Sequence, residues 1–430
     1  MKKTAFLILA ILLVYRVYAQ AAPENYTEAL NKFVRYYNAG QPDSIFSMFS
    51  PEMKASLSQD KFETTTTQLK NQLGVLNKTD FINFASPIAV YQAKFSNATF
   101  LLNLALDGRA QITGLFLKPQ EEQTTISAIP VDPAVTESPI MLKTMGGTLA
   151  GTLTMPNNVS GKIPVVLIVP GAGSVNRDGN DASADLQANT YKLLAFALGN
   201  AGIASVRYDK RMIGQSTSAD KEKNLNFEDY IDDATSLLSM LADDERFSKI
   251  IVAGHGQGSL VGMMATNEEP VKGFISLEGA ADPEEKMLTD AMKSQPEYKA
   301  NDIKRMIDSL KRGKTWDNID ISLYSIARPS IQPFIMSWCR YDPQREIKKL
   351  KMPVLIIQGT TDQEVKVDNG PKLKSAARSS AIYTVVRGMS FILKDGPPDR
   401  DANLATYKDP NLPLNKDLET AVITFIQGLK

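Results

Sequence analysis

The sequence predicts an α/β protein in which a mainly parallel sheet carries helices on both faces and a helical cap, with a small α+β domain ahead of it. Two observations support this prediction. Over residues 139–430, apolar runs of strand length alternate with segments of helical periodicity, which is typical of parallel sheets covered on both sides. Over residues 24–118, helical periodicity comes first and strand-like runs follow, which is the order of an α+β domain.

The first 19 residues have the pattern of a signal peptide. Lys2-Lys3 gives a basic start, Ala5–Val14 is an apolar run, and Val17–Ala19 fits a cleavage site with small residues. Tyr15-Arg16 interrupts the apolar run too early for a retained membrane anchor. We therefore expect an exported chain, periplasmic or secreted after cleavage near Ala19, with no stable membrane anchor.

The first domain, residues 24–118, begins with apolar residues at helical spacing and ends with strand-like runs. Polar turns such as Ser96-Asn97 and Asp107-Gly108 separate the strands. This order resembles the small cone-shaped domains of the nuclear-transport-factor-2-like group, which implies an apolar pocket or, more simply, a packed domain that docks on its neighbour. We expect helices over 26–37, 43–49, 51–57 and 61–76, and strands over 81–84, 89–95, 99–106 and 110–117.

Residues 119–138 carry prolines and glutamates in a polar setting, so we expect a linker there, before a second domain over 139–430. A long connection over about 283–343 contains helical patterns and predicts a cap inserted between two consecutive strands. The expected strands are 147–153, 165–169, 204–208, 250–253, 273–277, 354–358 and 382–386, and the expected helices outside the cap are 191–201, 228–241, 258–266 and 418–429.

Composition excludes several classes of function. Lys plus Arg and Asp plus Glu balance at 48 each, so nothing favours binding to nucleic acid or to an acidic membrane surface. The chain has one cysteine, Cys339, and one histidine, His255, which excludes an intramolecular disulfide and a metal site of the usual multi-His or multi-Cys kind. We expect no metal and no cofactor.

One stretch organises the larger domain. The apolar run Ile250–Ala253 breaks at Gly254-His-Gly-Gln-Gly258, and a helical pattern begins at Leu260. A strand, a tight glycine turn and a helix form the setting in which G-x-S-x-G enzymes expose a nucleophilic serine. Here the central residue is Gly256, which has no side chain and therefore no atom that can attack a substrate.

Four further segments accompany this turn in an order that resembles the α/β-hydrolases of the esterase and serine-aminopeptidase type. They match the oxyanion loop, the turn after the next strand, the loop with the triad acid and the loop with the triad base. In that order the segments are Val165–Gly173, Arg207–Ser216, Ile357–Val365 and Gly388–Lys394. Exported proteins of this type often carry a small domain of unknown function in front, which fits residues 24–118.

The resemblance implies a catalytic triad, but two of its three positions lack triad chemistry. The acid position is Asp362, the nucleophile position is Gly256, and the base position is Phe391, with Ser390 where the family has asparagine. No catalytic set is therefore intact. By the same resemblance, the oxyanion hole takes its donors from the backbone N–H group of Gln257 and from one N–H group in the loop Gly171, Ala172 and Gly173.

No replacement catalyst stands out among the residues near these motifs, which are Ser174, Ser259, Ser390, Lys210 and Lys394. Such serines and lysines are usually structural or solvated, and the serines have no spare imidazole to activate them. His255 lies in the turn itself and is expected to pack beneath it. Asp362 is more simply a cap of its own turn, and Asp209 and Arg211 an ion pair or turn anchor.

Two functions therefore remain open. One is a catalytically inactive hydrolase homologue, a pseudoenzyme, with a binding or regulatory role and either an ester- or peptide-like small ligand or a protein partner. The other is a serine-hydrolase-type esterase or peptidase with a rearranged active site. The first is favoured because the nucleophile position is a glycine and the chain has no other imidazole.

Overall fold

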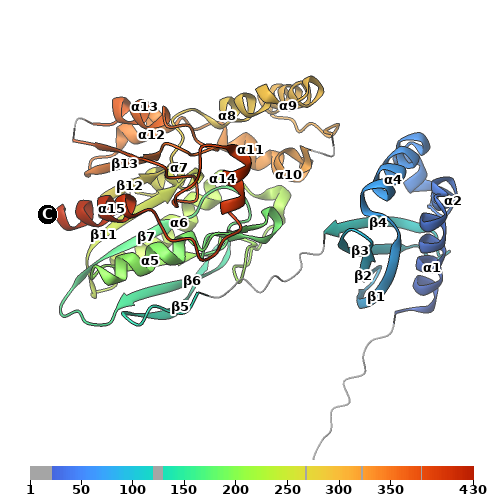
Figure 1. The fold of residues 1–430 in the computed structure, drawn as a ribbon, viewed down its shortest axis with the longest axis horizontal. Helices are drawn as coiled ribbons and strands as arrows, with labels where there is room; N and C mark the ends of the chain where they lie inside the picture. Colours follow the sequence, from blue (N-terminus) through green and yellow to red (C-terminus); the bar gives the residue numbers. More distant parts are fainter. Residues whose placement is uncertain (1–21, 120–128, 267–268, 321–322, 379) are drawn as a thin grey trace, which may run out of the picture. The chain divides into compact units, whose positions relative to one another are not determined.

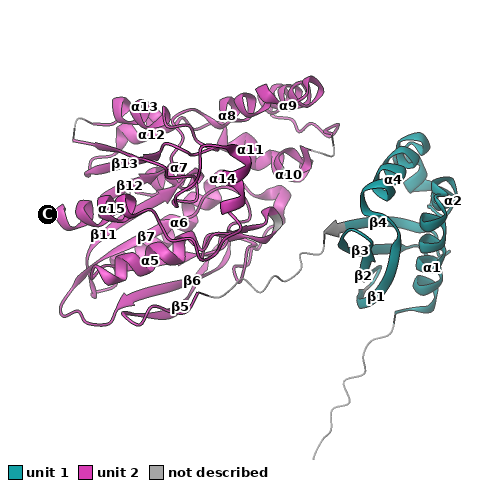
Figure 2. Cartoon of the chain, viewed as in Figure 1, with its two compact units in different colours: residues 1–124 teal, residues 125–430 magenta. Residues whose placement is uncertain are grey.

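The computed structural model describes residues 22–119, 129–266, 269–320, 323–378 and 380–430. The chain divides into two compact units, residues 1–124 and 125–430, which Figure 2 shows in separate colours. The predicted signal peptide lies outside the described residues. None of the helices in the described ranges has both the length and the apolar character needed to cross a bilayer.

The first unit is an antiparallel meander packed against helices, so the predicted α+β order is confirmed (Figure 1). Alternate residues of β3, such as Leu102 and Leu104, are fully buried and face a core formed with the helices. The resemblance to the nuclear-transport-factor-2-like group stays a prediction. The helices are α1 Glu24–Ala39, α2 Pro42–Ser47, α3 Pro51–Ser56 and α4 Gln59–Leu73, and the strands are β1 Leu76–Ala85, β2 Ile88–Phe95, β3 Thr99–Leu106 and β4 Ile112–Pro119.

The second unit is built on an eight-stranded sheet of order β14-β13-β12-β11-β7-β10-β6-β5. Only β6 runs against its neighbours, pairing antiparallel with β5 and β10, and all other pairs of this sheet are parallel, so the predicted mainly parallel sheet is confirmed. The strands are β5 Val135–Thr144, β6 Gly147–Pro156, β7 Ile163–Val169, β10 Ala204–Tyr208, β11 Phe247–His255, β12 Val271–Leu277, β13 Val354–Gly359 and β14 Ile382–Val386. A two-stranded ribbon, β8 Asn180–Asp181 and β9 Leu186–Gln187, lies in the connection after β7.

Helices cover both faces of this sheet because its central strands are apolar on both sides. One buried cluster contains residues of α6, α7, α12 and α13, and the other contains residues of α5 and α15. These helices are α5 Thr190–Asn200, α6 Phe227–Ala242, α7 Gln257–Ala265, α12 Pro343–Lys349, α13 Asn369–Ala376 and α15 Lys416–Gly428, and α14 Arg400–Thr406 precedes the last one.

The expected cap is present between β12 and β13. Its helices are α8 Glu284–Ala291, α9 Glu297–Leu310, α10 Tyr324–Ala327 and α11 Gln332–Trp338. They share a small core of their own, in which Met306 and Ile303 are almost fully buried.

The structure differs from the predicted linker, residues 119–138, at both ends. Pro119 is the last residue of β4, and β5 begins at Val135. Residues 120–128 lie outside the described part of the chain. Prolines and charges hid the start of β5, yet they are compatible with it because β5 is an edge strand, where such residues are tolerated.

Candidate functional site

The glycine turn has the local geometry of a nucleophile elbow. It joins β11 to α7, and Gly256 has φ +52° and ψ −116°, a conformation that side chains rarely adopt. The flanking glycines make the turn possible: a Cβ at Gly254 would collide with the carbonyl of Gly258, and one at Gly258 would collide with the carbonyl of Val169. The backbone is therefore arranged to expose a side chain at position 256, although glycine has no side chain.

The ring of Phe391 lies where a side chain at position 256 would be. A Cβ built on Gly256 would be 2.9 Å from Cζ and 3.2 Å from Cε2 of Phe391. The nucleophile and base positions are thus next to each other, as the family resemblance implies, but a glycine and a phenyl ring occupy them. The two substitutions fit together, since the ring uses space that the missing side chain leaves free.

His255 is a structural residue, in agreement with the sequence prediction. Its side chain is buried, and its Nε2 lies 2.7 Å from the carbonyl oxygen of Phe391, which can only accept a hydrogen bond. Nε2 therefore carries the proton, and Nδ1 accepts from the hydroxyl of Tyr191 at 2.9 Å. Burial lowers the pKa of His255 to about 4, so the ring is neutral and both nitrogens are occupied.

The predicted oxyanion loop lies beside the start of α7, but one of its predicted donors is already used. The N–H of Gly171 donates to the hydroxyl of Tyr191 at 2.8 Å, and its carbonyl accepts from Nζ of Lys210 at 2.6 Å. Gly171 is therefore not available as a donor to a ligand, which leaves Ala172 or Gly173 as the one donor that the resemblance places in this loop. Ala172 and Gly173 are exposed, and Gln257 opens α7, where the first N–H groups have no partner inside the helix.

Lys210 is nearly fully buried beneath this loop. Burial lowers the pKa of its ammonium group to about 7. Its Nζ lies 5.5 Å from the ring centroid of Tyr230 and holds the carbonyl of Gly171. We interpret it as a support for the loop rather than a base for residue 256.

Asp362 caps its own turn, which is one of the two roles predicted for it. Its Oδ1 accepts hydrogen bonds from the N–H groups of Glu364 and Val365 at 2.7 and 2.9 Å. Its other partner, the carboxyl group of Glu278, was missed at the sequence level. Glu278 follows β12 as Asp362 follows β13, and because these strands are neighbours the two carboxyl groups lie close enough to affect each other's pKa.

In the folded chain both carboxyl groups favour the protonated form more than they do in water. Burial and the nearby Asp362 raise the pKa of Glu278 well above its usual range, and burial raises the pKa of Asp362 to about 6. The N–H of Gly359 also donates to Oε1 of Glu278, at 2.7 Å. Glu278 thus places a second, protonated carboxyl group beside the acid position of a site that has no triad histidine. A charged residue directly after an apolar strand was the available sequence signal.

The serines near the motifs do not replace the nucleophile. Ser259 is buried and its Oγ lies 2.7 Å from Oγ of Ser276, and Ser390 is buried and donates to the carbonyl of Lys394. Ser174 is exposed in the loop after β7. Within the described residues, no group of three or more His, Cys, Asp or Glu side chains is arranged to hold a metal ion.

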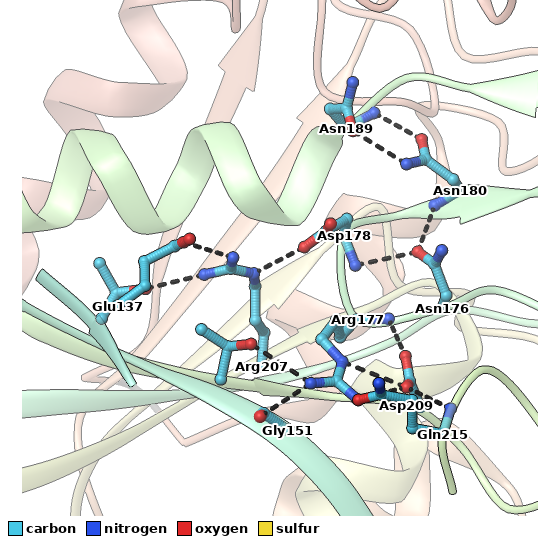
Figure 3. A network of polar contacts seen from close by, with 12 residues as sticks. Glu137, Gly151, Asn176, Arg177, Asp178, Asn180, Asn189, Arg207, Asp209 and Gln215 are labelled. Carbon is cyan, nitrogen blue, oxygen red and sulfur yellow. Dashed lines mark hydrogen bonds and ion pairs between the residues drawn. The ribbon is translucent and has the colours of Figure 1, made fainter. Parts of the chain in front are cut away.

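Two arginines, the partly buried Arg177 and the buried Arg207, fix the loop after β7 (Figure 3). Arg177 donates from Nη2 and Nε to Oδ2 of Asp209, at 2.6 and 3.1 Å, and from Nη1 to the carbonyl of Gly151. Arg207 donates to Asp178 at 2.9 Å and to Glu137 at 2.5 Å. The loop that carries the oxyanion residues is thus tied to β5, β6 and β10.

The expected pairing of Asp209 with Arg211 is wrong. Asp209 binds Arg177, whereas Arg211 binds Asp233 and Asp229 of α6 at 2.7 and 2.9 Å. Asp209 and Arg211 lie close together in the sequence after β10, but their side chains bind different partners. Each still anchors the turn after its strand, which was the other role expected of them.

Comparisons with known proteins agree with this geometry. The model of the serine aminopeptidase family S33 matches residues 186–317, which include Gly256 but end before Asp362 and Phe391. A model described as a protein of unknown function, DUF3887, matches residues 31–115. No curated protein matches the chain.

Solved structures with the same fold are distant in sequence. A hypothetical protein from Pseudomonas aeruginosa has 13% identity and a TM-score of 0.51, covering 74% of this chain and all of that one. Est1E from Butyrivibrio proteoclasticus, solved with ferulic acid, has 18% identity and a TM-score of 0.47, covering 67% and 98%. The esterase Pf2001 of Pyrococcus furiosus has 16% identity and a TM-score of 0.45, covering 69% and 93%. The second unit thus has the fold of the α/β-hydrolases, residues 186–317 match the serine aminopeptidase family, and a DUF3887 match lies ahead of them.

Proposed function

We propose that this chain is an exported, catalytically inactive hydrolase homologue with a binding or regulatory role. One observation carries the proposal: the phenyl ring of Phe391 lies 2.9 Å from the place of the Cβ that Gly256 lacks. The nucleophile and base are absent together, and the ring fills the space in which a serine hydroxyl and an imidazole would meet.

The loss of catalytic rate that follows from a missing nucleophile and a missing base is large enough to decide between an enzyme and a pseudoenzyme. Removing the nucleophile or the base of a serine triad lowers kcat by roughly a million-fold. The oxyanion hole and substrate binding alone leave roughly a thousand-fold advantage over water. This remaining activity is too low for a dedicated esterase or peptidase.

A rearranged hydrolase is the less favoured function. It needs a nucleophile with a base in reach, and both nitrogens of the chain's one histidine, His255, are engaged. The buried hydroxyls of Ser259 and Ser390 are bonded to other groups. What the site retains is a set of backbone donors near Gln257 and Ala172, which suit a carbonyl or carboxylate of an ester- or peptide-like ligand, or of a protein partner.

The catalytic question is tested by ester hydrolysis and active-site labelling of the mature chain. A short activated acyl ester and a serine-reactive phosphonate probe are used side by side, with Phe391→Ala and Asp362→Ala as background controls. The proposal expects no turnover above these controls and no labelling. Stoichiometric labelling with turnover would overturn it, and the labelled residue would identify the replacement nucleophile.

Export is tested separately, since it rests on the first 19 residues. Expression of the full chain in a Gram-negative host should give a periplasmic product whose N-terminus, determined by mass spectrometry, is Gln20. An unprocessed cytoplasmic product would contradict export and leave the catalytic question untouched.

A further inference from the structure

A large groove opens where the parallel strands begin, at the end of the sheet opposite to Gly256. Its volume is about 1180 Å³. Val271 and Ile382, the first residues of β12 and β14, line it, whereas Gly256 follows the last residue of β11. Because these strands are parallel, the groove and the glycine turn lie at opposite ends of the sheet. The groove is therefore separate from the candidate active site.

The floor of the groove is apolar. Ala421 and Phe425 of α15 face Leu355 of β13 and Ile382 of the edge strand β14. Ile382 is 52% exposed, although it belongs to the sheet. Ligand pockets usually measure about 300–1,000 Å³ and are lined mainly by apolar side chains, so this groove has the size and lining of a binding site.

Lysines gather at one end of the groove. Lys272 is the second residue of β12, Lys351 precedes β13 and Lys430 follows α15, so all three lie at the amino ends of the strands. A contact of Lys249 with the carbonyl of Leu429 holds the end of α15 there. Among the residues that the structure describes, none of Lys272, Lys351 and Lys430 forms an ion pair.

The other charges that the structure describes in the groove do not form ion pairs with Lys272 or Lys351. Lys349 also lines the groove but is paired with Glu346 at 2.6 Å. Two acidic residues line it, Glu269 and Asp417, and Glu269 accepts a hydrogen bond from Ser239. A ligand complementary to the groove therefore has a long apolar body and an anionic group at one end.

We propose that this groove binds a free long-chain fatty carboxylate. The acyl chain lies along α15 over Phe425 and Ile382, and the carboxylate meets Lys272 and Lys351. A second copy of the chain fits less well, because its groove would bring the same unpaired lysines against these ones. A membrane surface also fits less well, because the apolar side chains form the floor of a concave groove. The proposal is independent of the lost catalytic triad.

The apolar part of the proposal is tested by filling the groove. Thr424 is exposed on α15 and lines the groove, whereas Gln427 is exposed on the same helix and does not. Isothermal titration of the mature chain with sodium laurate or palmitate, below micelle-forming concentrations, should show one site. Thr424→Trp should weaken binding at least tenfold, Gln427→Trp should leave it unchanged, and circular dichroism checks the fold of both.

The charge part is tested with a double variant. Lys272→Gln with Lys351→Gln should weaken laurate binding by about three- to tenfold, which is the range for two exposed ion pairs. Lys304→Gln with Lys314→Gln, two exposed lysines of the cap region, is the matched control and should have no effect. The uncharged alcohol of laurate should bind the unaltered chain more weakly, and added salt should reduce only the binding of laurate.

Four results would overturn the proposal. The first is no binding of either fatty acid, and the second is equal weakening by Thr424→Trp and Gln427→Trp. The third is a dimer in sedimentation experiments that Thr424→Trp dissociates, which would assign the groove to a second copy. The fourth is co-sedimentation with phosphatidylglycerol vesicles that the double lysine variant abolishes while free laurate does not bind, which would assign it to a membrane.

Discussion

At position 256 the backbone has the conformation of a nucleophile elbow, although the glycine there carries no nucleophile. A φ of +52° with ψ −116° costs a residue with a side chain about 1–3 kcal/mol, whereas glycine adopts it freely. We expect Gly256→Ser to lose about that amount of stability in urea unfolding, and to stay inactive because an unassisted hydroxyl is a weak nucleophile.

The same variant separates backbone strain from the contact with the ring. Adding Phe391→Ala to Gly256→Ser removes the 2.9 Å contact and should return only the part of the loss that the ring causes. A serine variant as stable as the unaltered chain, or more stable, would contradict this account of the turn.

Restoring both missing groups tests how far the site has diverged. Gly256→Ser with Phe391→His places a hydroxyl and an imidazole at adjacent positions, with Asp362 at the acid position. We expect measurable hydrolysis of an activated ester, and only above about pH 6, because Asp362 has a pKa of about 6 and must be ionised to orient the imidazole. A folded double variant without activity would show that Asp362, beside Glu278, no longer serves the base position.

The carboxyl pair gives stability a dependence on pH. Asp362 has a folded-state pKa of about 6, above its ordinary value of 3.8, so between these values the folded chain binds more protons than the unfolded chain. Its stabilising contribution is complete below about pH 4 and is lost as pH rises through 6. The full shift corresponds to about 3 kcal/mol.

Asp362→Asn removes this titration and keeps an oxygen for the turn. Relative to the unaltered chain, the variant should gain up to about 3 kcal/mol as the pH of urea unfolding is raised from 4 to 7. Glu278→Gln should change stability in the same direction, since it removes the second raised pKa. A difference that is constant with pH, or that falls as pH rises, would mean that the pKa values of these two groups are not raised in the folded chain.

At the scale of elements, the loop after β7 depends on its arginines rather than on regular structure. Asp209 is almost fully buried and holds Arg177 through two side-chain contacts and through the N–H of Arg177. Removing one member of a buried pair leaves the other charge without a partner, which typically costs about 3–5 kcal/mol. We expect Asp209→Ala to lose stability by this amount in urea unfolding.

The matched control for Asp209→Ala is an exposed pair. Lys286 is half exposed and contacts Asp282 and Asp290, so Lys286→Ala should change stability by less than about 1 kcal/mol. Limited proteolysis should detect earlier cleavage within the loop of the Asp209→Ala variant only. Equal losses in the two variants would mean that the buried pair is as dispensable as the exposed one.

Local periodicity was sufficient to predict most elements of the sheet. Strands β10 and β14 have the predicted bounds, because apolar runs that end at glycine or charged residues leave little choice. The helices α12 and α14 were not predicted, because seven residues contain too few turns for a helical period to be visible. β5 was missed because edge strands tolerate proline and charge.

The site was predictable where the motif fixes the backbone and unpredictable where partners come from distant strands. The positions of Gly256, Asp362 and Phe391 follow from motif order. The pairing of Glu278 with Asp362 depends on β12 lying beside β13, and the use of the Gly171 N–H depends on Tyr191 from α5. Neither contact produces a periodic pattern in the sequence from which it could be predicted.

At the scale of the whole molecule, the two units have separate hydrophobic cores. Every residue of the first unit's cluster lies before position 118, and every residue of the other three clusters lies after position 134. A unit with its own core can unfold by itself. We therefore expect calorimetry of the mature chain to show two transitions rather than one.

A pair of core variants assigns the transitions to the units. Leu102 of β3 and Leu167 of β7 are both fully buried, and replacing a buried leucine by alanine costs about 2–5 kcal/mol. Leu102→Ala should lower the Tm of one transition only, and Leu167→Ala should lower the Tm of the other. The first unit buries a smaller core, so the loss at Leu102 is a larger share of its stability and should move its Tm further. A single transition that both variants shift equally would mean that the units unfold as one cooperative body, which their separate cores do not lead us to expect.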